Sequence, residues 1–278
     1  MNPHIKILVL NWNGMGVIEN CLKSISKINY TNYSVCIIDN NSKDGSVNFI
    51  ENNFKFYELI KNKSNLGYSK GYNIAFDEFK NNNSIDYYFI LNNDTIISDS
   101  NILNDLVLNA NNFGTNNIYS PLIFNSEGRI WFAGGKVNKF LGYTKHIGLN
   151  KNSKLGTYKT RKTDYISGCS MFISKKNIDN LKGFNTKYDM YYEDVDLCFR
   201  AKKINLDCYV IDSTFIQHNV SHSFKGFFKF KKMFKKFISM NKFIFSNNNF
   251  IISILILLYH LIMIPIYFVL YIVIIILR

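Results

Sequence analysis

A dense group of acidic residues offers the clearest chemistry in this sequence of 278 residues. Four acids and two tyrosines fall within eight positions: Asp189, Tyr191, Tyr192, Glu193, Asp194 and Asp196. Acids favour a helix N-terminus, and Asp196 can pair with Arg200 one turn later, so part of the group has a structural explanation. A carboxylate beside aromatic rings is poorly solvated, which raises its pKa and suits it to accept a proton from a substrate. The group predicts a helix start that can also carry a general base.

Polar segments also follow four apolar runs in the first hundred residues, at 11–14, 39–46, 65–73 and 92–95. A carboxylate such as Asp39 at the end of a buried strand can accept hydrogen bonds from a ribose or a base. Asp94 can hold Mg²⁺ or Mn²⁺ against a diphosphate, because these ions prefer oxygen ligands. Glycines and a lysine at a helix start favour an anion. Each segment taken alone is equally explained as a strand-to-helix turn with good capping residues.

The elements that position these residues are predicted from apolar periodicity. Strands are expected at 5–10, 35–38, 56–60 and 87–91, and apolar residues at helical spacing lie between or after them, at 18–25, 72–79 and 103–110. This alternation predicts an α/β fold with a mostly parallel sheet flanked by helices, and ligands at the carboxyl ends of its strands. The second half is less regular: strands are expected at 129–133, 165–173 and 208–211, with a mobile polar loop at 145–162.

The C-terminal part differs in composition from the rest. Residues 224–242 hold seven lysines and no acid, interleaved with phenylalanines, and residues 250–277 hold no charged residue. About 18–20 apolar residues suffice to cross a bilayer, and lysines beside such a run mark the cytoplasmic side. We therefore expect a main domain at 1–223, a basic amphipathic juxtamembrane segment at 224–249 and a membrane anchor at 250–278. The domain would lie at the cytoplasmic face of the cell membrane. His260 and Pro265 leave open whether the anchor spans, kinks or re-enters.

Charge and cysteine content exclude other classes of protein. Of the net charge of +13, eight positive charges lie in the tail, so residues 1–223 are only mildly basic. Lysines adjacent to an apolar run favour lipid over nucleic acid as the partner. Five cysteines at irregular spacing argue against a disulfide framework and against a structural zinc site.

Taken in order, the polar segments resemble the family 2 glycosyltransferases, in particular the rhamnosyltransferase-like branch. The resemblance covers about residues 5–223 and rests on the ordered set Trp12-Asn13, Asp39-Asn40-Asn41-Ser42-x-Asp44-Gly45-Ser46, Asn65-x-Gly67-x-x-x-Gly71-x-Asn73, Leu91-Asn92-x-Asp94, Ser167-Gly168-Cys169-x-Met171, and Gly183-Phe184 followed by Tyr192-Glu193-Asp194-Val195-Asp196-Leu197-x-x-Arg200. It implies a GT-A fold, and transfer of a sugar from a nucleotide diphosphate with inversion at the anomeric carbon.

The resemblance also implies a role for each segment. Asp194 would be the catalytic base and Glu193 would orient the acceptor. Asp94 would hold Mg²⁺ or Mn²⁺. His218 lies where some relatives place a further metal or diphosphate ligand, although a histidine after a strand is more often structural. The donor would be bound by Asn11, Asn13, Asp39, Asn41, Asn65, Gly67, Lys70, Asn73 and Asn92, with Asp39 at the nucleoside. Asn92 departs from the family pattern, which often has an Asp there.

The implied partners are a nucleotide-sugar donor, either dTDP-rhamnose or a UDP-sugar, and a saccharide acceptor. A polyprenyl-linked acceptor suits a membrane-anchored enzyme, because confinement to one surface raises its effective concentration. Two alternatives stay open. One is a polyprenyl-phosphate sugar synthase, which shares the fold and uses a lipid phosphate as acceptor. The other is a non-catalytic membrane-associated binding protein.

Overall fold

A computed structural model describes residues 2–138, 140–152, 157–219 and 227–276; within the last segment, side chains are described at 231–263. The first half contains β1 (Ile5–Asn11), α1 (Met15–Ile25), β2 (Tyr33–Asp39), α2 (Ser46–Asn53), β3 (Glu58–Lys61), α3 (Gly67–Glu78) and β4 (Tyr87–Asn92). The four predicted strands and the helices between them are confirmed. Their order in the sheet is β3-β2-β1-β4, and all of these pairs are parallel.

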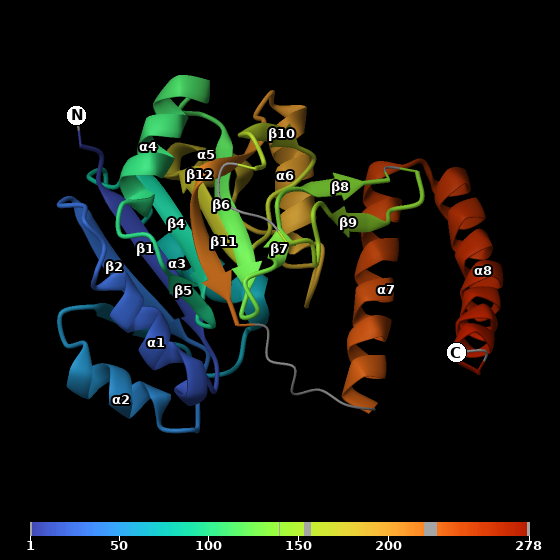
Figure 1. Ribbon diagram of the computed structural model, residues 1–278, viewed down its shortest axis with the longest axis horizontal. Helices are drawn as coiled ribbons and strands as arrows, with labels where there is room; N and C mark the ends of the chain where they lie inside the picture. The colour runs from blue at the N-terminus through green and yellow to red at the C-terminus, as the bar shows by residue number, and fades with distance from the viewer. Residues whose placement is uncertain (1, 139, 153–156, 220–226, 277–278) are drawn as a thin grey trace.

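The second half extends the same sheet. It contains β5 (Thr95–Ile97), α4 (Ile102–Phe113), β6 (Ile118–Asn125), β7 (Ile130–Phe132), β8 (Gly135–Val137), β9 (Thr144–His146), β10 (Arg161–Thr163), β11 (Ser170–Ser174), α5 (Lys175–Leu181), α6 (Glu193–Lys203) and β12 (Cys208–His218). β11 lies between β4 and β6 and is antiparallel to both, whereas β12 is parallel to β6. The fold is therefore α/β with a mixed, mostly parallel sheet: its first half is wholly parallel, and antiparallel strands join in the second (Figure 1).

The second half departs from the sequence-based prediction in two places. The segment expected to be a loop at 145–162 is bounded by β9 and β10, and its residues 153–156 lie outside the described part. β6 is absent from the sequence-based prediction; Pro121 interrupts its apolar run, and proline weakens a strand pattern. Pro121 lies opposite Ile211, where the register of β12 shifts. Such an irregularity tolerates a residue that cannot donate a ladder hydrogen bond.

The strand ends bring the polar segments to one edge of the sheet. Asn11 at the end of β1 lies opposite Asp39 at the end of β2, and Leu10 lies opposite Asn92 at the end of β4. In the second half, His218 at the end of β12 lies opposite Thr95. This edge therefore carries side chains from four strands, as expected for ligand binding at the carboxyl ends of parallel strands.

Two helices follow the sheet domain: α7 (Phe227–Asn247) and α8 (Phe250–Ile276). The β8–β9 hairpin reaches from the sheet towards α7, and α8 runs beside α7 (Figure 1). Met240, Phe243 and Ile244 of α7 are buried against the domain. The predicted boundary at 223–224 lies outside the described residues. Among the residues whose side chains are described, no helix is long and apolar enough to cross a membrane.

The core contains all five cysteines. Cys21, Cys36, Cys169, Cys198 and Cys208 are buried and none forms a disulfide. Burial raises the pKa of the Cys21 and Cys36 thiols to about 12, so both stay protonated and unreactive at neutral pH. The sequence-based prediction that these cysteines form no disulfide framework is confirmed.

Candidate active site

The acidic group of the sequence divides into a structural part and a part that lines a cavity. Asp196 accepts a hydrogen bond from Arg200 Nε at 2.7 Å, and the Arg200 guanidinium also donates to the carbonyls of Leu181 and Gly183. Asp196 is buried and also accepts from the Tyr188 hydroxyl at 3.2 Å, so it ties α6 to the segment before it. Glu193 and Asp194, at the first turn of the same helix, line a cavity of about 310 Å³ instead.

The turn before α6 sets the orientation of Glu193 and Asp194. Tyr191 and Tyr192 both adopt the left-handed conformation, with φ of 68° and 69°. Side-chain-bearing residues hold such angles only where surrounding contacts compensate a cost of about 1–3 kcal/mol each. The Tyr192 hydroxyl donates to the Gly142 carbonyl at 2.7 Å, and its ring packs on Phe243 of α7. Contacts with the β8–β9 hairpin and with α7 thus stabilise the strained turn.

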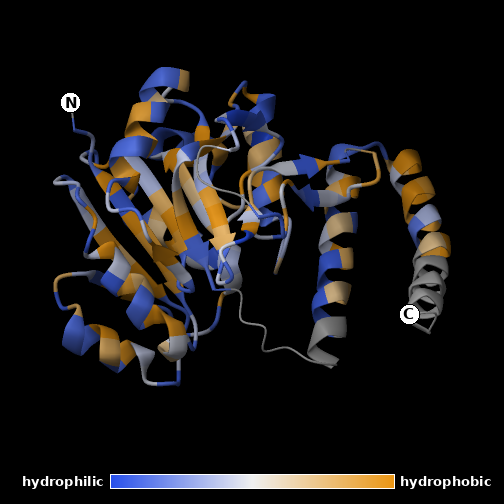
Figure 2. Cartoon of the chain, viewed as in Figure 1, coloured by the Kyte–Doolittle hydropathy of each residue, from blue (hydrophilic) through white to orange (hydrophobic). Residues whose placement is uncertain are grey.

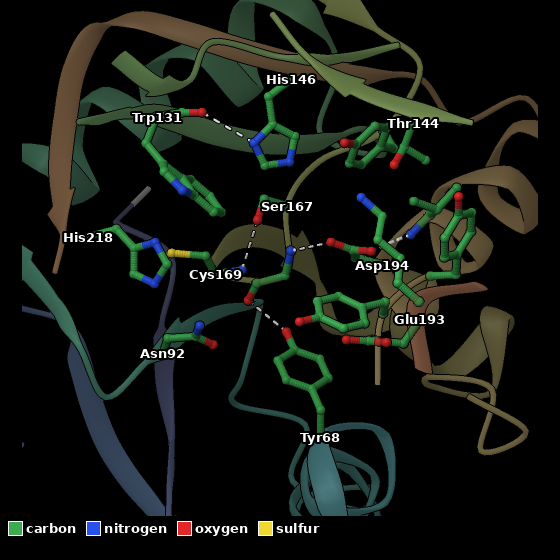
Figure 3. A pocket seen from close by; sticks show the side chains of 16 residues that line it. Tyr68, Asn92, Trp131, Thr144, His146, Ser167, Cys169, Glu193, Asp194 and His218 are labelled. Carbon is green, nitrogen blue, oxygen red and sulfur yellow. Dashed lines mark hydrogen bonds between the residues drawn. The ribbon is translucent and has the colours of Figure 1, made fainter. Parts of the chain in front are cut away.

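Asp194 is fixed by two backbone N–H donors. Its Oδ2 accepts from Gly168 N at 2.9 Å and its Oδ1 accepts from Val195 N at 2.8 Å. Gly168 is held in turn by Tyr68, whose hydroxyl donates to the Gly168 carbonyl at 2.6 Å (Figure 3). A Cβ at position 168 would lie 2.5 Å from that hydroxyl, so the close approach requires glycine. The Ser167-Gly168-Cys169 segment therefore positions the proposed base.

The two neighbouring carboxylates differ in their protonation. Burial raises the pKa of Glu193 to about 8, the charge of Asp194 adds to the shift, and Oε2 of Glu193 has no hydrogen-bond partner among the described residues. Burial also raises the pKa of Asp194, but the N–H groups of Gly168 and Val195 oppose this shift by stabilising the ionised form. The two N–H groups favour the ionised form of Asp194, the form that can accept a proton, whereas burial favours the protonated form of Glu193.

We expect Glu193→Gln to stabilise the fold at alkaline pH. The unfolded chain releases the Glu193 proton near its ordinary pKa of about 4.5, whereas the folded chain holds it up to about 8. The free energy of unfolding therefore falls as pH rises between these values. Gln removes this loss, so its melting temperature should exceed the wild-type value at pH 9 and match it at pH 4.5. Because Glu193 keeps some solvent contact, we expect a gain of about 2 kcal/mol at most.

A matched control for this variant is Glu78→Gln, which removes an exposed carboxylate from α3. Its melting temperature should follow the wild-type curve at every pH. Parallel curves for wild type and Glu193→Gln would show that Glu193 titrates normally.

Asp94 and His218 are brought together by the pairing of β5 with β12. Asp94 Oδ1 lies 3.1 Å from His218 Nε2, yet the two atoms are not aligned as a hydrogen bond, and Asp94 Oδ1 has no hydrogen-bond partner among the described residues. Two adjacent ligands of an octahedral ion with bonds of about 2.1 Å are about 3 Å apart. The pair therefore fits a divalent ion. No group of three or more His, Cys, Asp or Glu side chains suited to a metal occurs in the described part of the chain, so the remaining ligands would be diphosphate oxygens and water.

The ends of β1 and β2 form a hydrogen-bonded network. Asn11 Nδ2 donates to Asp39 Oδ1 at 2.9 Å and to Ser46 Oγ at 3.0 Å, while Ser42 donates to Asp39 from its backbone N–H and its hydroxyl. Asn93 joins the network through Asn11 Oδ1 at 2.9 Å. Asn11 and Asp39 are buried, so the network fixes the turns of the predicted donor site. Their contact with a nucleoside stays a prediction.

The other predicted donor residues lie around this network, and they differ in how many hydrogen bonds hold their side chains. Asn13 Oδ1 accepts from Lys43 N, and Asn41 Nδ2 donates to the Lys63 carbonyl, so both brace turns. Asn65 Oδ1 accepts from Gly67 N and shapes the start of α3, where Gly67 has φ of 75° and Lys70 is exposed. Asn73 makes both of its side-chain hydrogen bonds with the Phe184 backbone. This geometry favours a structural role for Asn73 over the predicted contact with the donor.

The cavity also gathers residues that the sequence did not single out. Four of the predicted site residues, Asn92, Glu193, Asp194 and His218, line it, and further lining comes from Tyr68, Trp131, Thr144, His146, Tyr165 and Lys236. Trp131 contacts both imidazoles edge-on, with ring centroids 4.7 Å from His146 and 4.5 Å from His218 (Figure 3). Trp131, Thr144 and His146 come from three-residue strands, whereas Tyr68 comes from the start of α3, Tyr165 from the segment between β10 and β11, and Lys236 from α7. Strands this short show no periodicity, and only the rarity of tryptophan could have drawn attention to Trp131.

Two curated relatives of this chain are named as a hexosyltransferase and a rhamnosyltransferase. It is 24% identical over 217 residues to the low-salt glycan biosynthesis hexosyltransferase Agl10 of Haloferax volcanii, a match that covers 77% of this chain and 67% of that protein. It is 22% identical over 240 residues to the N-acetylglucosaminyl-diphospho-decaprenol L-rhamnosyltransferase of Mycobacterium tuberculosis, covering 80% and 78%.

Solved structures show the same fold at lower identity. GalNAc-T7 with UDP, GalNAc and Mn²⁺ matches with a TM-score of 0.62 at 13% identity, over 78% of this chain and 44% of that one. S. aureus TarS 1–349 in complex with UDP matches with a TM-score of 0.58 at 15% identity, over 88% and 66%. This chain thus spans less than two thirds of either chain, and the likeness establishes a GT-A-like fold. The family model described as glycosyl transferase family 2 matches residues 6–181. The chain belongs to glycosyl transferase family 2.

Proposed function

We propose that this family 2 glycosyltransferase moves a sugar from a nucleotide-diphosphate donor to a hydroxyl of a lipid-linked saccharide, with inversion at the anomeric carbon. The observation that carries the proposal is the Asp194 carboxylate, which lines the cavity and is held by Gly168 N–H in the form that accepts a proton. A sugar hydroxyl is a poor nucleophile until such a base takes its proton.

The proposed reaction is a single displacement. The acceptor oxygen forms a bond to C1 of the donor sugar while the bond from C1 to the diphosphate oxygen breaks. The acceptor proton passes to Asp194, and the nucleoside diphosphate leaves with the electron pair. Attack from the side opposite the leaving group inverts C1. Because one base suffices, this route needs no second nucleophile and no covalent intermediate.

Asp94 and His218 are the residues that would hold the divalent ion. When bound there, Mg²⁺ or Mn²⁺ would offset the negative charge that develops on the departing diphosphate. The imidazole of His218 is a softer ligand than oxygen, which favours Mn²⁺ over Mg²⁺. Asn92 at the end of β4 supplies an amide oxygen in the same cavity.

We further propose that the protein works at the cytoplasmic face of the cell membrane. Support comes from the lysines of 224–242 and the apolar composition of 250–277. The described part of α8 is predominantly hydrophobic (Figure 2), and Phe250, Ile251 and Leu255 expose 60% or more of their surface. An acceptor carried by a membrane lipid would reach the cavity at the cytoplasmic surface of the membrane.

The test uses the full chain in detergent. Purified protein is incubated with dTDP-rhamnose or UDP-sugars, with Mn²⁺ or EDTA, and with N-acetylglucosamine joined through a diphosphate to an alkyl chain, the acceptor type named for the M. tuberculosis relative. We expect Mn²⁺-dependent product with one donor, and an inverted anomeric configuration by NMR. Retained configuration would contradict the proposed mechanism. Transfer to a lipid phosphate but to no saccharide would establish the polyprenyl-phosphate synthase alternative instead.

A further inference from the structure

Helix α7 contributes directly to the catalytic cavity. Lys236, near the middle of this helix, lines the cavity together with Glu193 and Asp194. The helix lies more than thirty residues beyond the carboxylates in the sequence, yet Figure 1 shows it beside the β8–β9 hairpin that borders the same cavity. The element that sequence analysis assigned to membrane attachment is therefore also a wall of the active site.

The position of Lys236 is fixed by contacts one to two turns further along α7. Ser239 Oγ donates to the Met190 carbonyl at 2.8 Å, and Lys242 Nζ donates to the Lys187 carbonyl at 2.7 Å. Phe243 packs on Tyr192 and Phe199, with ring centroids 5.6 Å and 4.8 Å away. These contacts tie α7 to the turn that precedes Glu193. The lysine and the carboxylates are thereby held as one unit.

Lys236 supplies an uncommitted positive charge to the cavity. It is the only Lys or Arg among the described lining residues, it is exposed, and the described part of the chain offers it no hydrogen bond or ion pair. Its charge lowers the pKa of Asp194, although burial has the larger, opposite effect. An unpaired ammonium in a cavity that binds substrate is suited to an anionic group of that substrate.

The residues along one face of α7 change in character towards the cavity. Residues three or four positions apart share a helix face. Ile244 and Met240 are buried against Gly142, Lys236 follows at the cavity, and Met233 follows with 60% of its surface exposed. From its exposed end inwards, this face of α7 presents the apolar side chain of Met233, then the ammonium group of Lys236, and then the cavity. A lipid-linked saccharide presents the same three parts in the same order: apolar chain, phosphate and sugar.

We propose that Lys236 binds the phosphate that joins the acceptor saccharide to its lipid carrier. This inference rests on the proposed function and adds the acceptor group that α7 recognises. Lys236 then places the acceptor hydroxyl at Asp194 by holding the phosphate on the membrane side of the cavity. The carrier's apolar chain continues along the exposed end of α7 towards the bilayer.

The experiment compares two acceptors on the full chain in detergent. One is N-acetylglucosamine joined to a short alkyl chain through a diphosphate, and the other is the same sugar joined directly to that chain. The variants are Lys236→Gln, Lys236→Arg and the matched control Lys231→Gln, which removes an equal charge from an exposed position of α7 outside the cavity. Acceptor KM, kcat and the rate of donor hydrolysis are measured for each.

We expect Lys236→Gln to raise the KM for the diphosphate-linked acceptor about ten-fold, the effect of losing one charge-assisted contact. The KM for the directly linked acceptor should stay unchanged. Any change that arises through the pKa of Asp194 should alter kcat for both acceptors, and donor hydrolysis, by the same factor. Lys236→Arg should restore the wild-type KM, and Lys231→Gln should match the wild type throughout.

Three results with the variants, and two with the wild-type protein, would overturn the inference. An equal loss with both acceptors would mean that Lys236 acts only on the carboxylates. An equal loss in Lys231→Gln would mean that the general charge of α7 is responsible. Unchanged KM values for Lys236→Gln would show that Lys236 does not contact the phosphate of the acceptor. Wild-type protein that hydrolyses donor but shows the same KM for both acceptors would refute the inference and leave the proposed function intact. Wild-type protein that neither binds nor hydrolyses any nucleotide sugar would refute both.

Discussion

Asp194→Asn is expected to lower the rate of sugar transfer by about 10³-fold or more, while the affinity for the nucleotide stays unchanged. The substitution keeps the size and shape of the side chain but removes its ability to take the acceptor proton. Donor binding is spared because Asp194 contacts the Gly168–Cys169 side of the cavity, and the predicted nucleoside residues lie at the ends of β1 and β2. Single-turnover transfer and nucleotide titration on the same preparation measure the two effects.

The controls for this variant must separate catalysis from stability. Asp194 accepts from two N–H groups through two different oxygens, and asparagine has one oxygen, so one of these groups loses its partner. We expect a loss of about 1–2 kcal/mol in the free energy of unfolding, which a melting curve detects. Asp189→Asn, at an exposed position of the same acidic segment, should transfer normally. Wild-type turnover in Asp194→Asn would reject Asp194 as the base.

Asp94→Ala is expected to abolish the dependence of nucleotide binding on Mn²⁺ and to weaken binding by about 10²-fold in its presence. The expectation follows from the unpartnered Oδ1 of Asp94 beside His218 Nε2, a pair that fits two ligands of one ion. The fold should tolerate the change, because its structural bond, from Asn219 N to the Asp94 carbonyl, belongs to the backbone. Titration calorimetry of a nucleoside diphosphate with and without Mn²⁺ gives the result directly.

Two further variants sharpen this test. His218→Gln should reduce the Mn²⁺ effect by about 10-fold, since a second ligand is weakened and not removed. Asp77→Ala removes an exposed acid from α3 and should leave the titration unchanged. Identical heats with and without Mn²⁺ in the wild-type protein would reject the metal assignment for both residues.

The sequence predicts the first half of the fold well because local patterns govern it. Buried strands of parallel sheets appear as short apolar runs, and the helices between them show their own period. The polar residue that ends each run must then lie at the carboxyl edge. Asn11 opposite Asp39 confirms this reasoning. The same logic places Asp94 near the predicted site without any knowledge of its partner.

The rest of the site depends on contacts that no local pattern records. His218 meets Asp94 only because β12 shifts register between Ile211 and Phe215 and then pairs with β5. Trp131 and Lys236 enter the cavity from a three-residue strand and from a helix beyond the sheet domain. Their positions follow from tertiary packing, which a single sequence does not display.

The glycine-rich segment shows how a plausible pattern can have another cause. From the sequence alone, the glycines at the start of α3 favour an anion, although a strand-to-helix turn explains them equally well. A Cβ at Gly71 would lie 2.6 Å from Leu10 Cδ1, so this glycine lets the helix pack closely on β1. Asn73, in the next turn, ties α3 to Phe184. Packing between helix and strand therefore accounts for part of a segment that resembled a ligand site.

The two halves of the sheet also differ in how far apart along the chain their paired strands lie. β1 to β4 pair within residues 5–92, whereas Tyr119 of β6 pairs with Tyr209 of β12. Pairs close in sequence form faster because less chain entropy is lost, and N-terminal segments leave the ribosome first. We therefore expect the half that carries the predicted donor residues to be structured while the half that carries Glu193 and Asp194 is still being translated. A nucleotide sugar that binds the predicted donor residues would stabilise the nascent chain before any acceptor could reach it.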